Sequence, residues 1–153
     1  RSNKLIPRKE EVKPDVVMPV VPEFLRQVVR IAYKEADRSS DWWRQVGAVL
    51  FNDKDEIILV GFNKHLPDEH IPNIYGDFRA FLNAGEDPDW GTALHAERMI
   101  FGKALKQGIS TNGLSLYVTT YPCAGCAAMI SQTGINVSTT LKDIQWHNKP
   151  EIC

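Results

Sequence analysis

The chain has 153 residues, of which 43% are hydrophobic and 24% charged, and its formal net charge is −1. This is the length and composition of one globular domain that can bury an ordinary core. The near-neutral charge excludes a basic surface over the whole molecule, so nucleic acid is not the expected partner. No apolar run is long enough to span a membrane and no signal-peptide pattern is present, so we expect no membrane partner.

The use of cysteine indicates the compartment, and the first residue bears on the extent of the chain. Two of them belong to the metal motif described below, which leaves Cys153 and no basis for an internal disulfide framework. This use of cysteine favours a reducing, cytoplasmic location. Because the chain begins at Arg1 instead of methionine, we expect it to be a fragment or a trimmed form.

The first half of the chain predicts an arm, a helix and a hairpin. Residues 1–20 combine charge with three prolines and predict an extended arm or linker ahead of a single domain over 21–153. From Pro22 to about Arg38, apolar residues recur at helical spacing, which predicts an amphipathic helix. Apolar runs over 46–51 and 56–62, separated by turn residues, predict a β-hairpin.

A long irregular stretch follows the hairpin and runs to Thr92. It contains several prolines and glycines, and a short helix is predicted over 78–82. A connection of this length in a compact domain shapes a binding site or is mobile. His65 and His70 could form a second metal site, but no cysteine accompanies them, so we expect surface histidines.

The second half predicts two helices and two strands. A helix over 94–107 is closed by Gly108, a buried strand covers 114–119, and a second helix runs from Pro122, well suited to a first helical position, to Gly134. A last strand is expected over 135–140. Strands that alternate with helices in this way indicate an α/β layer architecture. The tail from Leu141 shows no readable pattern.

Two short segments carry metal-binding chemistry. His95-Ala96-Glu97 supplies an imidazole and a carboxylate, and Pro122-Cys123-Ala124-Gly125-Cys126 supplies two thiols. Zinc prefers four tetrahedral ligands, and a catalytic site keeps one position for water. His95, Cys123 and Cys126 make three ligands, and this H-x-E with P-C-x-x-C is the signature of zinc-dependent nucleobase deaminases. The predicted cofactor is therefore Zn²⁺.

The positions of these residues at helix starts support that prediction. At the first turn of a helix, His95 and Glu97 can both reach an ion near the helix axis, and the two cysteines share one face of the second helix. Two helix N-termini would then face the metal and favour thiolates. A structural site would need a fourth protein ligand from His65, His70, His147 or Cys153, none of which has a characteristic zinc spacing.

The order of strands and helices around these segments, over about Phe24 to Val137, resembles the cytidine deaminase superfamily. Within it the sequence is similar to the deoxycytidylate (dCMP) deaminase branch. Four segments carry the resemblance: VGAV at 46–49 with GFN at 61–63, and YPCAGCA at 121–127 with QTGI at 132–135. Asn63 and His95 are also 32 positions apart, where dCMP deaminases have a long insert and tRNA-adenosine deaminases a much shorter connection.

The resemblance implies a fold, a reaction and an assembly. The fold would be three-layered, with a mixed central sheet of about five strands between helices. The reaction would be zinc-dependent hydrolytic deamination of a free cytosine nucleotide, dCMP to dUMP first, with dCTP or a cytosine nucleoside also open. Glu97 would act as general acid and base without binding zinc. A homo-oligomer is expected by the same resemblance.

The resemblance also implies substrate contacts. Asn63 would bind the sugar, the backbone amide of Ala96 would hold the base carbonyl, and Tyr121 would line the base pocket. Arg79, Arg98 and Lys64 are candidates for the phosphate, although solvated surface charge is the default for each.

Two other functions stay open. A polynucleotide deaminase acting on tRNA or single-stranded DNA would need a basic, aromatic channel, for which Trp42, Trp43 and Arg44 are candidates. Adjacent tryptophans beside a strand are more often core or oligomer contacts. The second alternative is a non-catalytic, zinc-stabilised binding module, in which four protein ligands would surround the metal.

Overall fold

The computed structural model describes residues 21–83 and 93–138. The predicted arm and the whole tail from Leu141, with His147 and Cys153, lie outside this part of the chain. The elements are α1 (Glu23–Ala36), β1 (Gly47–Phe51), β2 (Ile57–Phe62), β3 (Lys64–His65), α2 (Ile71–Tyr75), the 3₁₀ turn η1 (Phe78–Phe81), β4 (Ala93–Leu94), α3 (Ala96–Gln107), β5 (Ser115–Val118), α4 (Ala124–Ser131) and β6 (Asn136–Ser138). In the described ranges, no helix has the length and apolar character needed to cross a bilayer.

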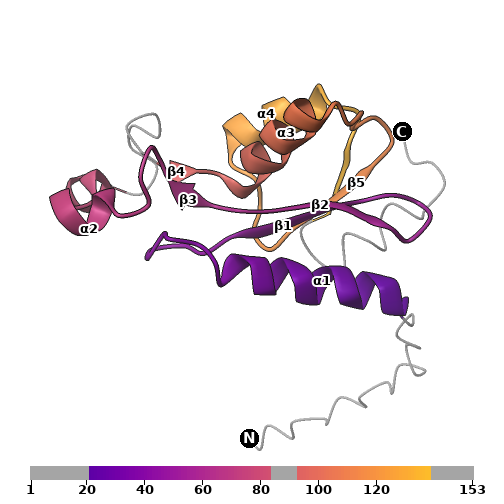
Figure 1. Ribbon diagram of the computed structural model, residues 1–153, viewed down its shortest axis with the longest axis horizontal. Helices are drawn as coiled ribbons and strands as arrows, with labels where there is room; N and C mark the ends of the chain where they lie inside the picture. Colours follow the sequence, from indigo (N-terminus) through magenta and orange to yellow (C-terminus); the bar gives the residue numbers. More distant parts are fainter. Residues whose placement is uncertain (1–20, 84–92, 139–153) are drawn as a thin grey trace, which may run out of the picture.

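The central sheet is mixed and has the order β2-β1-β5-β6. β1 pairs antiparallel with β2 and with β5, and β5 pairs parallel with β6. α1 covers one face of this sheet, and α3 and α4 cover the other (Figure 1). The predicted mixed sheet between helices is confirmed. Over the described residues it has four strands instead of about five, because β3 turns away after β2 and pairs with β4 in a separate two-stranded sheet.

Each face of the sheet has its own hydrophobic core. Neighbouring residues of a strand point to opposite faces, so Val49 packs with Val28 and Ala32 of α1, whereas Leu50 packs with Ile100 of α3. All five residues of β1 are buried, as expected for a central strand covered on both sides. The core that contains Leu50 and Ile100 holds α3 and α4, whose starts carry the predicted metal ligands, against the sheet.

Two glycines let the helices approach the sheet closely. A Cβ on Gly61 of β2 would lie 2.8 Å from the carbonyl oxygen of Ala96 and 2.9 Å from the side chain of Ile100, in α3. A Cβ on Gly47 of β1 would meet the backbone of Ala32, in α1, at 1.8 Å. The start of α3, next to His95, is therefore set by the absence of a side chain at Gly61.

The longer elements match the sequence predictions. Of the short elements, the helix predicted over 78–82 is present as the 3₁₀ turn η1, and the strand predicted over 135–140 is present, within the described residues, as β6. The first helix, the hairpin, the helix closed by Gly108 and the strand before the cysteines are confirmed within one or two residues. α2, β3 and β4 have five residues or fewer and were not predicted. The second helix of the motif was predicted from Pro122 to Gly134, but α4 begins at Ala124 and ends at Ser131.

Candidate metal centre

The predicted ligands lie at the starts of two helices that cover the same face of the sheet (Figure 1). His95 is the N-cap of α3 and directly follows β4. Cys123 is the N-cap of α4, and its sulfur accepts a hydrogen bond from the backbone N–H of Cys126 at 3.4 Å. Pro122 therefore lies before the cap, where it restrains the chain as it enters the helix. The N-cap side chains of both helices, His95 and Cys123, lie close together at these two helix starts.

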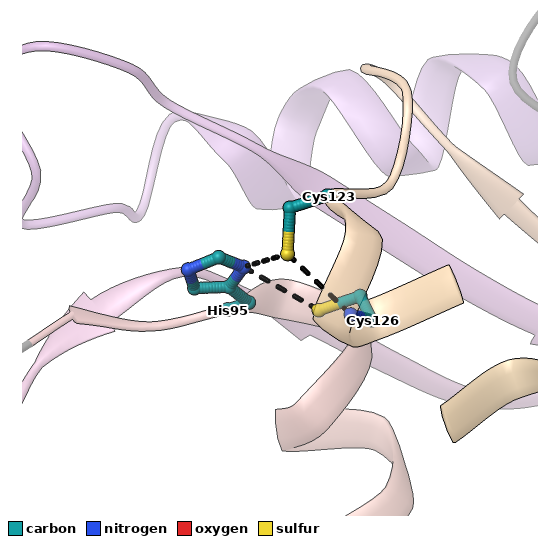
Figure 2. Close-up of side chains that lie close together, drawn as sticks. All are labelled: His95, Cys123 and Cys126. Carbon is teal, nitrogen blue, oxygen red and sulfur yellow. Dashed lines mark hydrogen bonds between the residues drawn. The ribbon is translucent and has the colours of Figure 1, made fainter. Parts of the chain in front are cut away.

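The imidazole of His95 faces both sulfurs, as Figure 2 shows. Its Nδ1 atom lies 3.5 Å from Sγ of Cys123 and 3.4 Å from Sγ of Cys126. Zinc bond lengths of about 2.0–2.1 Å to nitrogen and 2.3 Å to sulfur, at a tetrahedral angle, place such ligand atoms about 3.5 Å apart. The donor set and its spacing therefore fit a zinc ion.

The two thiols differ in exposure. Cys123 is exposed, whereas Cys126 is fully buried. Burial, with a smaller contribution from the nearby carboxylate of Glu97, raises the pKa of the Cys126 thiol to about 12. The helix N-terminus and burial act in opposite directions on this thiol, because the first favours the thiolate and the second the neutral form. The Cys126 thiolate accordingly needs a bound cation for its stabilisation.

Glu97 lies in the first turn of α3 and is 4% exposed. It is not among the groups whose ligand atoms converge, which are His95, Cys123 and Cys126. Its charge nevertheless acts on Cys126, so the carboxylate lies close to the metal ligands. Ala96, the first residue of α3, is also buried. A buried carboxylate beside the metal ligands, but outside their cluster, is the arrangement expected of a proton-transfer group.

The structure offers no fourth ligand among the described residues, since the convergent cluster has three members. His70 is exposed in the insert, as predicted. His65 was predicted to be a surface histidine, and that prediction is wrong, because the side chain is 1% exposed. Its backbone N–H donates to the hydroxyl of Ser40, and the paired strands β3 and β4 fix it inside.

The two other predicted substrate residues have different surroundings. Tyr121 is 71% exposed and lies next to Pro122, at the approach to the metal ligands. Asn63 is buried, and its side chain bonds to the loop that precedes β1. Its Oδ1 accepts from the backbone N–H of Val46 at 2.8 Å, and its Nδ2 donates to the carbonyl oxygen of Arg44 at 2.7 Å.

A charged network beside Asn63 was missed at the level of sequence. Arg79 was expected to be a solvated charge or a phosphate contact, but it binds both oxygens of Asp41 and also Asp77. Asp41, in the loop before β1, is only 2% exposed. No spacing rule links these positions, since the two partners are 38 residues apart. A loop aspartate just before a buried strand was the one available signal.

The comparison with known families identifies the chain. Residues 22–141 match the family described as the cytidine and deoxycytidylate deaminase zinc-binding region. The chain belongs to this family. It is 29% identical to the deoxycytidylate deaminases of Pongo abelii and Homo sapiens, over 85% of this chain and 68% of each relative. The metal of this deaminase is therefore zinc, and the donor set described above is chemically suited to it.

Solved structures show the same fold. The dCMP deaminase of the cyanophage S-TIM5 in apo form matches with a TM-score of 0.58 and 24% identity, over 83% of this chain and 94% of that chain. The structure of that protein in complex with dCMP and dUMP matches with a TM-score of 0.55, at 23% identity, over 82% of this chain and 90% of that chain. The cytidine deaminase-like arrangement of helices and sheet predicted from the sequence is confirmed.

Proposed function

We propose that this deaminase converts dCMP to dUMP by hydrolysis, with His95, Cys123 and Cys126 as its zinc ligands. The observation that carries the proposal is the cluster of one imidazole and two thiols, with the buried carboxylate of Glu97 beside it. The relatives named deoxycytidylate deaminases and the phage enzyme that binds dCMP and dUMP support the choice of substrate.

Zinc held by these three residues would supply a Lewis acid that makes water a stronger nucleophile near neutral pH. Glu97 would take a proton from the attacking water as its oxygen adds to C4 of cytosine, and would pass that proton to N3. Glu97 would then take the second proton of the water from the hydroxyl now on C4 and deliver it to the departing amino group, so that the C4 carbonyl forms, the C4–N bond breaks and ammonia leaves. Its burial in the first turn of α3 keeps the carboxylate close to where these protons move.

The chain's backbone and side chains would orient the nucleotide. The N–H of Ala96 is one of the amides that the first turn of α3 leaves without an intrahelical partner, and we assign it to the base carbonyl. Tyr121, exposed next to the cysteine segment, would contact the base from the open side.

Asn63 is suited to one kind of contact with the sugar. Both protons of Nδ2 are directed at protein acceptors, namely Asp41 and the carbonyl of Arg44, and Oδ1 accepts one bond from Val46. An amide oxygen can accept two hydrogen bonds, so one acceptor position remains. Asn63 would therefore accept a hydrogen bond from a sugar hydroxyl, and it has no donor left for a phosphate.

One observation favours a polynucleotide substrate as a second candidate. Trp42 and Trp43 are 68% and 56% exposed, so they are not the core residues that their position beside a strand suggested. Exposed aromatic rings can stack on the bases of a single strand. However, the ring of Trp43 lies over the guanidinium of Arg79, whose charge is already paired with two carboxylates.

We further propose that the protein acts as a cytoplasmic homo-oligomer. α4 presents three consecutive apolar residues to solvent, Ala127, Ala128 and Met129, which is unusual for a helix without a partner. Cys123 and Cys126 are free thiols, which suits a reducing compartment. Sedimentation of the protein, compared with that of Met129→Lys, tests the assembly. A wild-type monomer would contradict it.

A panel of substrates tests the reaction. Ammonia release is measured with cytosine, cytidine, dCMP, dCTP and a cytosine-containing oligonucleotide, at low and high salt. The proposal predicts the highest kcat/KM with dCMP and little dependence on salt. Turnover confined to the oligonucleotide and lost at high salt would instead establish the polynucleotide reading. A zinc-loaded protein without activity on any of the five would contradict both.

A further inference from the structure

The side chain of Asn63 is held in one orientation by groups that come from a single loop. Val46 donates to Oδ1 through its backbone N–H, whereas Arg44 offers a carbonyl oxygen to Nδ2. Rotation of the amide by half a turn would bring two donors together and two acceptors together. The remaining bond of Nδ2, at 3.3 Å, goes to Oδ2 of Asp41.

Asp41 is a charged group held inside the protein. Its side chain is 3% exposed, and Oδ1 accepts from the backbone N–H of Trp43 at 2.9 Å and from that of Arg44 at 3.3 Å. Burial alone would raise the pKa of Asp41, but the hydrogen bonds from Arg79 and from these two amides outweigh it and hold the pKa below its usual value. Asp41 therefore stays ionised and keeps its acceptor oxygens available.

Arg79 forms a bidentate salt bridge with Asp41, which fixes the plane of the carboxylate. Its two terminal nitrogens donate to Oδ2 at 2.8 Å and to Oδ1 at 3.1 Å. The Nε atom donates to both oxygens of Asp77, the N-cap of η1, at 3.0 Å. The ring of Trp43 lies 5.0 Å from the guanidinium carbon. Arg79 thus connects η1, which lies in the insert between β3 and β4, to the loop that holds Asn63.

We propose that Asp41 is a positioning residue for the sugar contact of Asn63, and that Arg79 holds Asp41 in place from the insert. This inference rests on the proposed function, in which Asn63 accepts a hydrogen bond from a sugar hydroxyl. Asp41 itself touches no substrate. Asp41 accepts a hydrogen bond from the second N–H of the Asn63 amide. This bond fixes the amide so that the remaining acceptor position of Asn63 Oδ1 is directed away from the loop.

The test compares dCMP with 2′,3′-dideoxycytidine monophosphate, which lacks the hydroxyl that Asn63 would bind. In Asp41→Ala the preference for dCMP, as a ratio of kcat/KM values, should fall by up to about tenfold, the upper range for one hydrogen bond between neutral groups. kcat on the dideoxy nucleotide should stay near that of the wild type. A merely structural role would lower the rates of both nucleotides together, and that result would overturn the inference.

Three further variants separate positioning from stability. Asp41→Asn keeps the shape but leaves one acceptor oxygen, which the backbone N–H groups of Trp43 and Arg44 also require, so it should restore little of the preference. Asp53→Ala removes an exposed carboxylate in the turn between β1 and β2, and should leave the preference unchanged. In an Asn63→Ala background, Asp41→Ala should cost no further preference, because the two residues act in series. Additive losses would contradict that.

A measurement without substrate keeps the two proposals distinguishable. The solvent exchange of the Asn63 side-chain amide protons, followed by NMR, should be at least about tenfold faster in Asp41→Ala than in the wild type, while the amides of β1 stay protected. Unchanged exchange would overturn the positioning role, whatever the substrate proves to be. A wild-type protein inactive on dCMP would instead refute the proposed function alone.

Discussion

The metal centre and the Asp41–Arg79 network both bring charged or metal-binding groups together, but in opposite ways. In the network, donors alternate with acceptors, and each carboxylate oxygen meets a guanidinium or an amide. At the metal centre, an imidazole nitrogen lies within 3.5 Å of each of two sulfurs, and burial opposes ionisation of Cys126. Donors and acceptors that pair with one another stabilise the scaffold. Three metal-binding atoms that converge on one point form a ligand site.

The largest expected effects come from the metal centre. Cys126→Ala removes a ligand, so zinc and activity should be lost together. Glu97→Gln leaves the three ligands intact, so zinc should stay at the wild-type stoichiometry while kcat falls about 10²- to 10⁴-fold. Metal content by mass spectrometry and ammonia release measure the two effects. A Glu97→Gln protein without zinc would make Glu97 a ligand and end this division of roles.

In the network, the expected effect is on stability. Arg79→Met leaves the buried carboxylate of Asp41 without its cation, and should lower the free energy of unfolding by about 2–3 kcal/mol, somewhat less than for a fully buried pair. Arg30→Met breaks the exposed ion pair with Glu23 and should cost at most about 0.5 kcal/mol. Urea denaturation of both variants measures the contrast. Equal costs would mean that the network contributes no more than a surface pair.

A substitution at Gly61, where α3 contacts β2 closely, tests whether the scaffold positions the metal ligands. A Cβ there presses on Ala96 and Ile100, so Gly61→Ala should cost about 1–3 kcal/mol and weaken zinc binding, because the start of α3 must move. Gly102→Ala adds the same methyl group to α3 where nothing lies within 4 Å, and should stabilise the protein by about 0.5–1 kcal/mol. Thermal unfolding and zinc titration distinguish the two. Unchanged zinc affinity in Gly61→Ala would show that the ligands do not depend on this contact.

The smallest expected effect is on the pH dependence of stability. The pKa of Asp77 is lowered mainly by its hydrogen bonds with Arg79, and that of Asp41 is lowered as described above. A carboxylate with a lowered pKa in the folded state stabilises the protein above its unfolded pKa, and this contribution is lost as the pH falls below about 3.8. Arg79→Met should therefore lose less stability on acidification than the wild type. The urea midpoints of the wild type and of Arg79→Met between pH 5 and pH 3 measure this difference. Midpoints that fall in parallel with pH would contradict the prediction.

The parts of the molecule that the sequence predicted are those with a repeating or contiguous signal. The helical period of Val28 and Ala32, the apolar runs of the hairpin and the HAE and PCAGC segments each lie within a short window. β3 and β4 have two residues each, too few to show a period. Asp41 and Arg79 meet only because the insert folds back onto the loop before β1. The burial of His65 follows from the same event, so a single sequence could not show it.

X-ray absorption at the zinc edge of the purified protein tests the central claim most directly. The account predicts two sulfur neighbours at about 2.3 Å and two light neighbours at about 2.0–2.1 Å, only one of which is an imidazole nitrogen. The other should be an oxygen that an added small anion replaces. A shell of two sulfurs and two imidazoles, or of three sulfurs and one imidazole, would show that protein fills all four positions and would contradict a hydrolytic centre.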